Sequence, residues 1–127
     1  MPTMIRVGER YYRSSGETRR ATRHQVESVA AARAALIAVA QLGEKITYTD
    51  LAAAIGAYNY RNIGTLLDAV AVDCRKRREP NLPAIAVTIA TDEPGYEYAH
   101  GNHDRIRSDQ RKVWNRWRGH RRQRGEE

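Results

Sequence analysis

The residue types most suited to chemistry gather at positions 58–62, which read YNYRN. Arginine and asparagine side chains hydrogen-bond to base edges and phosphates, and tyrosine rings stack on bases. Thr65 follows this run, and Tyr48 precedes it in a short β-prone segment. The chemistry that these residues favour is binding through hydrogen bonds and stacking.

A second polar run, GNHD at positions 101–104, resembles one signature of the metallophosphatases, in which the asparagine and histidine serve a two-metal site. Those enzymes also carry an upstream Asp-x-His and a GDxxD run, and neither occurs in this sequence. A generic metal site from His100, His103 and Asp104 is an alternative, but we favour a polar loop. We expect no metal, no cofactor and no enzymatic activity.

Cys74 is the only cysteine, which excludes an intrachain disulfide and disfavours a cysteine-based zinc site. It falls on an apolar helical stripe, so we expect a buried thiol that acts as a small hydrophobe.

Residues 44–78 contain the elements that must position the YNYRN run. Residues 44–48 favour a short strand, and Thr49 is a good N-cap for a short helix that ends at Gly56. A second helix opens at Arg61 or Asn62 after a short connection. Two helices joined by a short turn after glycine are typical of a helix-turn-helix.

The second helix has one apolar face and one mixed face. Its apolar positions recur at helical spacing; they are Ile63, Leu66, Leu67, Val70 and Cys74. The opposite face, which we expect to be exposed, carries Arg61, Thr65, Asp68, Ala69, Val72 and Lys76.

The segment after this helix predicts a wing. Residues 84–91 (AIAVTIAT) are β-branched and bounded by turn residues, so we expect a strand, with residues 96–98 returning as its partner. The order of elements then predicts a mainly α fold with a small β-ribbon (α+β), a winged helix-turn-helix with an added C-terminal amphipathic helix.

The chain divides into four parts by composition. Residues 1–24 form a basic N-terminal arm, which we expect to add little to the core. Residues 25–104 form the winged-helix domain and begin with a helix over 25–42. Residues 105–118 form a basic amphipathic helix that Trp114 and Trp117 dock onto the domain, and residues 119–127 form a disordered tail.

Lys and Arg number 22 against 15 Asp and Glu, which gives a net charge of +7. The excess of arginine favours a nucleic-acid partner, although a GC-rich genome would also raise arginine and alanine. The sequence has no apolar window long enough for a transmembrane helix and no secretory signal. We therefore expect no membrane partner and a cytoplasmic, nucleoid-associated location.

Around residues 45–62 the chain resembles the C-terminal domain of the O6-alkylguanine-DNA alkyltransferases and the alkyltransferase-like proteins. The matching residues are Gly43, Ile46, Thr47, Tyr48, Leu51, Ala52, Gly56, Arg61, Asn62, Ile63 and Gly64. The resemblance implies that Tyr48 handles a phosphate and that Arg61 enters the duplex from the minor groove. The family's Pro-Cys-His-Arg run is absent, since residues 82–87 read LPAIAV, and this excludes alkyl transfer.

The chain also resembles small uncharacterised bacterial and phage winged-helix proteins over most of residues 44–117. The residues that carry this likeness are Ile46, Thr47, Tyr48, Leu51, Ala52, Leu82, Pro83, Ala84, Ile85, Pro94, Gly95, Tyr96, Val113 and Trp114. This likeness implies one winged-helix module and no known activity.

Together these features predict a non-enzymatic protein that binds double-stranded DNA, such as a transcriptional or phage regulator. The DNA-binding residues that we predict are Tyr48, Tyr58, Asn59, Tyr60, Arg61, Asn62, Thr65, Arg75, Lys76, Arg111, Arg116 and Arg118. One alternative is a protein-interaction module that uses Ala69 and Val72, or Trp114 and Trp117. Another is an RNA- or ribosome-associated protein.

Overall fold

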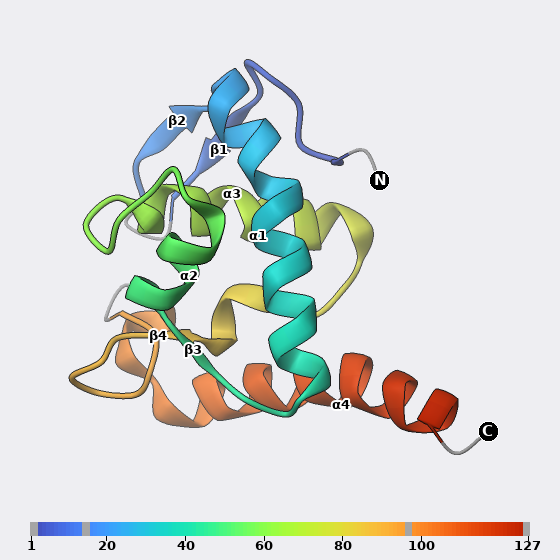
Figure 1. Cartoon of the computed structure of the whole chain (residues 1–127). Helices are drawn as coiled ribbons and strands as arrows, with labels where there is room; N and C mark the ends of the chain where they lie inside the picture. The colour runs from blue at the N-terminus through green and yellow to red at the C-terminus, as the bar shows by residue number, and fades with distance from the viewer. Residues whose placement is uncertain (1–2, 14–15, 96–97, 126–127) are drawn as a thin grey trace.

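The computed structural model describes residues 3–13, 16–95 and 98–125, with side chains up to Arg118. It is mainly helical with short strands (Figure 1). The first element is an antiparallel hairpin of β1 (Arg10–Tyr12) and β2 (Thr18–Arg20), in which Arg10 lies opposite Arg20 and Tyr12 opposite Thr18.

The helix α1 (Arg23–Gln41) is the centre of the fold and packs against both α3 and α4. It begins with a capping box, since the Thr22 hydroxyl accepts from the Gln25 N–H and the Gln25 side chain accepts from the Thr22 N–H. The predicted helix over 25–42 is confirmed, with both ends slightly earlier.

The short strand and first helix of the predicted helix-turn-helix are present as β3 (Ile46–Thr47) and α2 (Tyr48–Ile55). The N-cap is Thr47, whose hydroxyl accepts from the Asp50 N–H, and the expected cap at Thr49 is wrong because the helix begins earlier. Gly56 ends α2 at φ 87°, a left-handed conformation that glycine adopts without strain.

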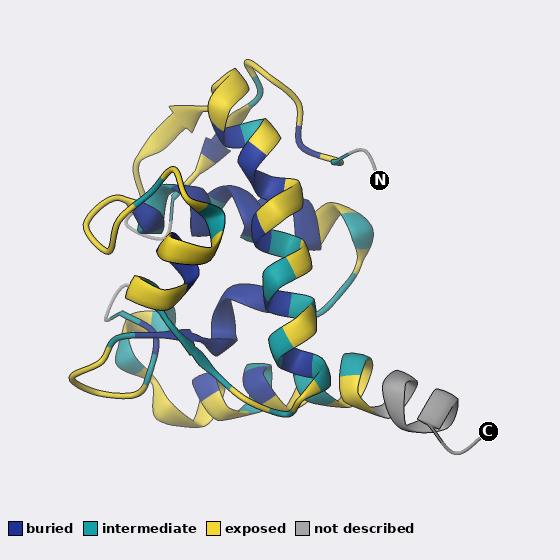
Figure 2. Cartoon of the chain, in the orientation of Figure 1, coloured by how far each residue is buried: buried dark blue, intermediate teal, exposed yellow. Residues whose placement is uncertain are grey.

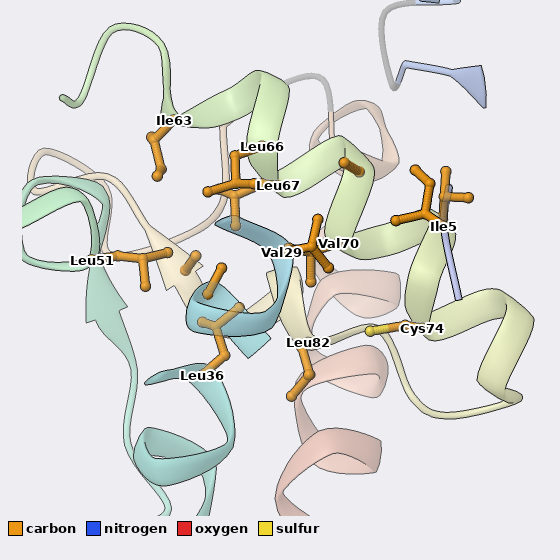
Figure 3. Close-up of a cluster of buried hydrophobic side chains, with 14 of the residues drawn as sticks. Ile5, Val29, Leu36, Leu51, Ile63, Leu66, Leu67, Val70, Cys74 and Leu82 are labelled. Carbon is orange, nitrogen blue, oxygen red and sulfur yellow. The ribbon is translucent and has the colours of Figure 1, made fainter. Parts of the chain in front are cut away.

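The helix α3 (Ile63–Arg77) carries the predicted apolar stripe, which is buried along its whole length. Figure 3 shows Ile63, Leu66 and Val70 directed toward Val29 and Leu36 of α1 and Leu51 of α2. Arg78 then ends the helix at φ 57°.

Within the described residues the predicted wing is not found. Residues 82–85 are a 3₁₀ turn, η1 (Leu82–Ile85), and only β4 (Ala86–Val87) is a strand, paired in parallel with β3. The expected run over 84–91 ends early because Thr88 closes a turn, accepting the Thr91 N–H on its hydroxyl and donating its own N–H to the Glu93 carbonyl. Of the expected partner strand, Tyr98 belongs to a 3₁₀ turn, η2 (Tyr98–Gly101), and residues 96 and 97 lie outside the described part of the chain.

The C-terminal helix α4 (His103–Gly125) crosses the end of α1. It continues beyond Arg118, where we expected a disordered tail to begin. Ile106 and Val113 are buried in its inner face, and the Trp114 indole donates to the Glu44 carbonyl (3.0 Å). The predicted docking of this helix through its tryptophans is confirmed, since both pack against the core.

The core extends further toward the N-terminus than the sequence predicted. Ile5, Tyr11 and Ala21 are each at most 3% exposed and belong to the same buried cluster as α1 and α3. The expectation that residues 1–24 add little to the core is therefore wrong for these three side chains. Figure 2 shows that the buried side of each helix faces the neighbouring helices. No helix in the described residues is long and apolar enough to cross a membrane.

Candidate nucleic-acid interface

The start of α3 projects from the molecule because local hydrogen bonds hold it. The Asn59 side chain accepts from the N–H groups of Arg61 (2.8 Å) and Asn62 (3.2 Å), and the Asn62 side chain accepts from the Asn59 N–H (2.8 Å). These bonds order the turn of residues 59–62 before α3, whose own N-cap, Asn62, makes no side-chain cap hydrogen bond. Tyr60, Arg61 and Asn62 are exposed, and we call them the helix tip.

Within the helix tip, Arg61 and Tyr60 bind each other. The Arg61 Nε donates to the Tyr60 hydroxyl (3.1 Å), and the guanidinium lies 5.6 Å from the centre of the Tyr60 ring. Both residues keep large exposed surfaces, and Tyr60 is 59% exposed. The pair therefore presents a planar cation and an aromatic ring to solvent.

Further along α3, three polar side chains are bonded to the N-terminal segment, residues 3–13. Asp68 pairs with Arg13 (2.8 Å), and Lys76 pairs with Glu9 (2.6 Å). Asp73, only 1% exposed in its side chain, accepts from the N–H of Ile5 and from the Arg77 Nε.

The predicted protein-binding patch of Ala69 and Val72 is wrong. Ala69 is fully buried and Val72 is 5% exposed. The reason is that the N-terminal segment binds Asp68, Asp73 and Lys76, which flank these two residues along α3.

The hairpin carries the basic side chains nearest to the helix tip. Tyr11 points into the core, so Arg10, Tyr12 and Arg20 share the outer side of the ribbon, which we call the hairpin face. Arg10 and Arg20 are directly opposite each other, and like charges in that position destabilise a sheet. Tyr12 beside them is 72% exposed.

The helix tip and the hairpin face lie at the same end of the molecule. The Arg13 side chain, which follows β1, passes the backbone of Gly64 at the first turn of α3. His24, at the start of α1, stacks on Tyr58 with ring centres 5.2 Å apart. The start of α1, the hairpin and the turn before α3 therefore form one continuous basic end.

A groove of about 610 Å³ runs along the outer side of α3. The helix contributes Gly64, Asp68, Ala71 and Arg75 to the groove. Tyr12 and Arg13 of the hairpin border one part of it, and η2 with the start of α4 borders another. The middle of α3 is thus recessed between neighbouring elements, and only its tip projects.

Polar side chains at the groove are bonded to one another. Asn81 donates to the Tyr98 hydroxyl (3.0 Å), which donates to the Asp109 carboxylate (2.8 Å). Burial and the hydrogen bond to Asp109 raise the pKa of Tyr98 far above its ordinary value. The Tyr48 hydroxyl accepts from the Gly95 N–H (2.8 Å) and also borders the groove.

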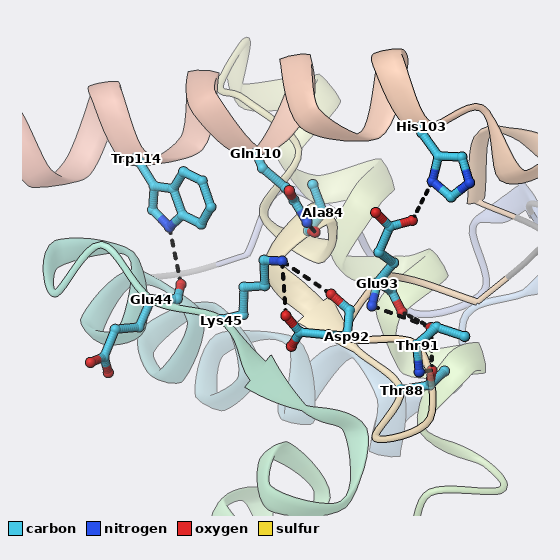
Figure 4. A network of polar contacts seen from close by, with 10 residues as sticks. All are labelled: Glu44, Lys45, Ala84, Thr88, Thr91, Asp92, Glu93, His103, Gln110 and Trp114. Carbon is cyan, nitrogen blue, oxygen red and sulfur yellow. Dashed lines mark hydrogen bonds and ion pairs between the residues drawn. The ribbon is translucent and has the colours of Figure 1, made fainter.

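The GNHD run begins α4. Asn102 accepts from the Arg105 N–H (3.0 Å) as an N-cap, and His103 Nδ1 lies 2.6 Å from the Glu93 carboxylate (Figure 4). Gln110 of the same helix donates to the Ala84 carbonyl (3.0 Å). Within the described residues no group of three His, Cys, Asp or Glu side chains is placed to hold a metal ion.

The cations of α4 form two flanks. Arg107, Arg111 and Arg118 lie on one side at spacings of four and seven residues, and we call them the free flank. They are exposed, and among the described side chains no ion pair links them to an acid. The other side, the paired flank, consists of Arg105, Lys112 and Arg116. Its two arginines lie 4.0 Å from Asp109 and 3.6 Å from Glu79.

The predicted binding residues are therefore not gathered in one place. Those engaged within the protein are Tyr48, Tyr58, Asn59, Lys76 and Arg116. Those exposed at the basic end are Tyr60, Arg61 and Asn62, with Thr65 half-buried beside them. Arg75 lies in the groove, and Arg111 and Arg118 lie on the free flank of α4.

Sequence reasoning missed the hairpin face. The signal that could have found it is the Ser-Ser-Gly run of the sequence between Tyr12 and Thr18, since such residues separate the strands of a hairpin. Cys74 is a buried thiol as predicted, and burial raises its pKa to about 11. Burial likewise raises the pKa of Tyr58.

Comparisons of this chain with family models, with curated proteins and with solved structures found no match.

Proposed function

We propose that this chain is a non-enzymatic protein that binds double-stranded DNA through the helix tip and the hairpin face. In this proposal α2 and α3 act as a helix-turn-helix, and the N-terminal hairpin takes the position beside α3 that we had predicted for a C-terminal wing. Tyr60 and Arg61 contact bases or backbone, and Arg10 and Arg20 contact phosphates.

The observation that carries the proposal is the pairing of Arg10 with Arg20 across the hairpin. This like-charge pair costs stability in the free protein. Among the described residues no acid forms an ion pair with either side chain. The Arg20 Nη1 donates to the Gly8 carbonyl (3.2 Å), a neutral acceptor that leaves the net charge of both arginines uncompensated. A phosphate placed between the two guanidinium groups would relieve the repulsion and would form charge-assisted hydrogen bonds.

Duplex DNA suits these two elements better than duplex RNA. The major groove of B-form DNA admits a helix or a two-stranded ribbon. The major groove of A-form RNA is too narrow for side chains to read. The projecting elements here are one helix tip and one ribbon.

The experiment is binding of a labelled random-sequence duplex across a salt series, measured by fluorescence anisotropy. We expect the variants Arg10→Gln and Arg20→Gln each to weaken binding. Each should also reduce the slope of log K against log salt concentration (the salt slope) by about 1, since each removes one phosphate contact. The matched control is Arg78→Gln, because Arg78 is an exposed arginine at the far end of α3.

A second readout separates a binding role from a structural one. Because removing either partner ends the repulsion, Arg10→Gln or Arg20→Gln should leave the free energy of unfolding unchanged or raised by a few tenths of a kcal/mol, about the size of a cross-strand pair. Equal salt slopes for wild type, Arg20→Gln and Arg78→Gln would remove the hairpin face from the interface. Absence of any salt-dependent binding would overturn DNA binding itself.

A further inference from the structure

The free flank of α4 differs from the paired flank in how far acids of the same protein neutralise its positive charge. Arg105 and Arg116 lie within ion-pair distance of Asp109 and Glu79, so part of their charge is neutralised within the protein. Arg107, Arg111 and Arg118 lie on the same helix, yet no acid of the described residues pairs with them. The two flanks carry equal formal charge, but on the paired flank two of the three cations are partly compensated by acids of the described residues, and only Lys112 is not.

The protein holds part of the free flank in place. The Arg118 guanidinium lies over Gly43, so closely that a Cβ on that residue would be 2.8 Å from its Nη1. The nearby Trp114 indole is fixed to the Glu44 carbonyl, and the Glu44 carboxylate points away from α4 (Figure 4). From Arg107 to Arg118 the helix rises about 16 Å, so the three arginines are spread along one side of α4.

The free flank is far from the hairpin face. The hairpin lies beside the start of α1, whereas α4 and Gly43 lie at its other end (Figure 1). With 19 residues, α1 separates the two surfaces by about 28 Å.

Between the two surfaces, the exposed side chains of α1 after His24 include no arginine or lysine. Along α1 the exposed side chains after His24 are those of Glu27, Ala30, Ala31, Ala34 and Ala38. A straight duplex laid along this helix would face alanines and one acid. One duplex that reached both ends would have to bend around the molecule, which costs elastic deformation energy.

We propose that the free flank is a second surface for duplex DNA, so that one chain bridges two DNA segments. This inference rests on the proposed function, because the hairpin face and the helix tip hold the first segment. The free flank holds the second through phosphate contacts alone, since it offers arginines without a projecting helix end or ribbon.

The test is a bridging assay with the full chain. One duplex is immobilised, the protein is added, and capture of a second, labelled duplex of the same sequence is measured. The test variant is Arg107→Gln/Arg111→Gln/Arg118→Gln. The matched control is Arg105→Gln/Lys112→Gln/Arg116→Gln, which removes three charges from the same helix and gives the same net charge. Both are checked for folding by circular dichroism.

We expect wild type and the matched control to capture the second duplex. The test variant should capture at least tenfold less of the second duplex, while its affinity for a single duplex changes by less than threefold. Capture by the test variant at the wild-type level would overturn the inference, and so would equal losses in both variants. If wild type binds one duplex but captures no second, the inference fails and the proposed function stands. If wild type binds no duplex, both fail.

Discussion

The two ends of α3 carry similar polar side chains and meet different surroundings. At its start, Tyr60, Arg61 and Asn62 are exposed and bonded only within the same turn. Further along, Asp73 and Lys76 are bonded to backbone and side chains of the N-terminal segment. Polar side chains of one helix are thus available for binding at one end and are bonded within the protein at the other.

This difference shows that an amphipathic pattern does not indicate contacts with segments distant in the sequence. Helical spacing says which residues turn away from the nearest core, but another segment can still cover them. Here the covering segment is more than sixty residues distant from Asp73 along the chain. The polar residues beneath it serve stability, and those beyond its reach are free to serve binding.

The largest predicted effect is a loss of stability from Asp73→Ala, at the end of α3 that is bonded to the N-terminal segment. This change removes a carboxylate that accepts from the Ile5 N–H and from the Arg77 Nε, and leaves the buried Ile5 N–H without that acceptor. Loss of one partner of a buried pair costs about 3–5 kcal/mol. Urea denaturation followed by tryptophan fluorescence measures this loss.

The control for that change is Asp68→Ala, whose carboxylate meets Arg13 at a more exposed place. We expect it to cost less than half as much. Equal losses for the two variants would show that the N-terminal segment is not anchored mainly at Asp73.

The next largest predicted effect is a loss of DNA affinity from Arg61→Ala, at the exposed start of α3. If Arg61 reads a base, its loss should weaken binding of a selected duplex by about 1–3 kcal/mol. The free energy of unfolding should change by less than about 0.5 kcal/mol, because the side chain is on the surface. Anisotropy titrations and urea denaturation measure the two quantities.

Arg75→Ala is the control for Arg61→Ala, because it removes an arginine from the other end of α3. Arg75 lies about 21 Å further along α3, in the groove. Its removal should change affinity much less than that of Arg61. An equal loss would mean that α3 lies on the DNA along its whole length, against the recessed position of its middle.

A smaller effect should follow from Asn59→Ala, which removes the acceptor for the N–H groups of Arg61 and Asn62. Loss of the hydrogen bonds that order this turn costs about 1 kcal/mol of stability, and it should also weaken DNA binding because the helix tip loses its fixed geometry. Thermal unfolding and anisotropy report the two losses. Asn59→Asp keeps the acceptor and should restore most of both; failure of this rescue would argue against ordering of the turn by Asn59.

Much of the fold could be predicted from local pattern. The apolar stripe of α3, the glycine that ends α2 and the docking tryptophans of α4 all follow from residue type and helical spacing. Each of these features depends on contacts that repeat along one helix, so the sequence around it carries enough information.

Features that depend on distant contacts could not be predicted in this way. Ala84, Ile85, Ala86 and Val87 are all buried, so their apolar run does not distinguish a 3₁₀ turn from a strand. The parallel pairing of β4 with β3 also joins segments forty residues apart. For the candidate site, the helix tip was predicted, but the hairpin face was not, because Arg10 and Arg20 meet only once the ribbon has formed.

The smallest effect concerns the Glu9–Lys76 pair, which ties the N-terminal segment to the covered end of α3. Burial raises the pKa of Glu9, but the hydrogen bond and charge of Lys76 and the Arg6 N–H outweigh it, so the pKa lies below its ordinary 4.5. The stability that the ionised group contributes is therefore present above pH 4.5 and is lost as the pH falls through the lowered value. Because the pair is partly exposed, Glu9→Gln should cost only a few tenths of a kcal/mol near neutral pH. Thermal unfolding of both proteins across the acid range measures the difference, which should vanish in acid; a difference that stayed constant with pH would assign it to packing rather than to the charge.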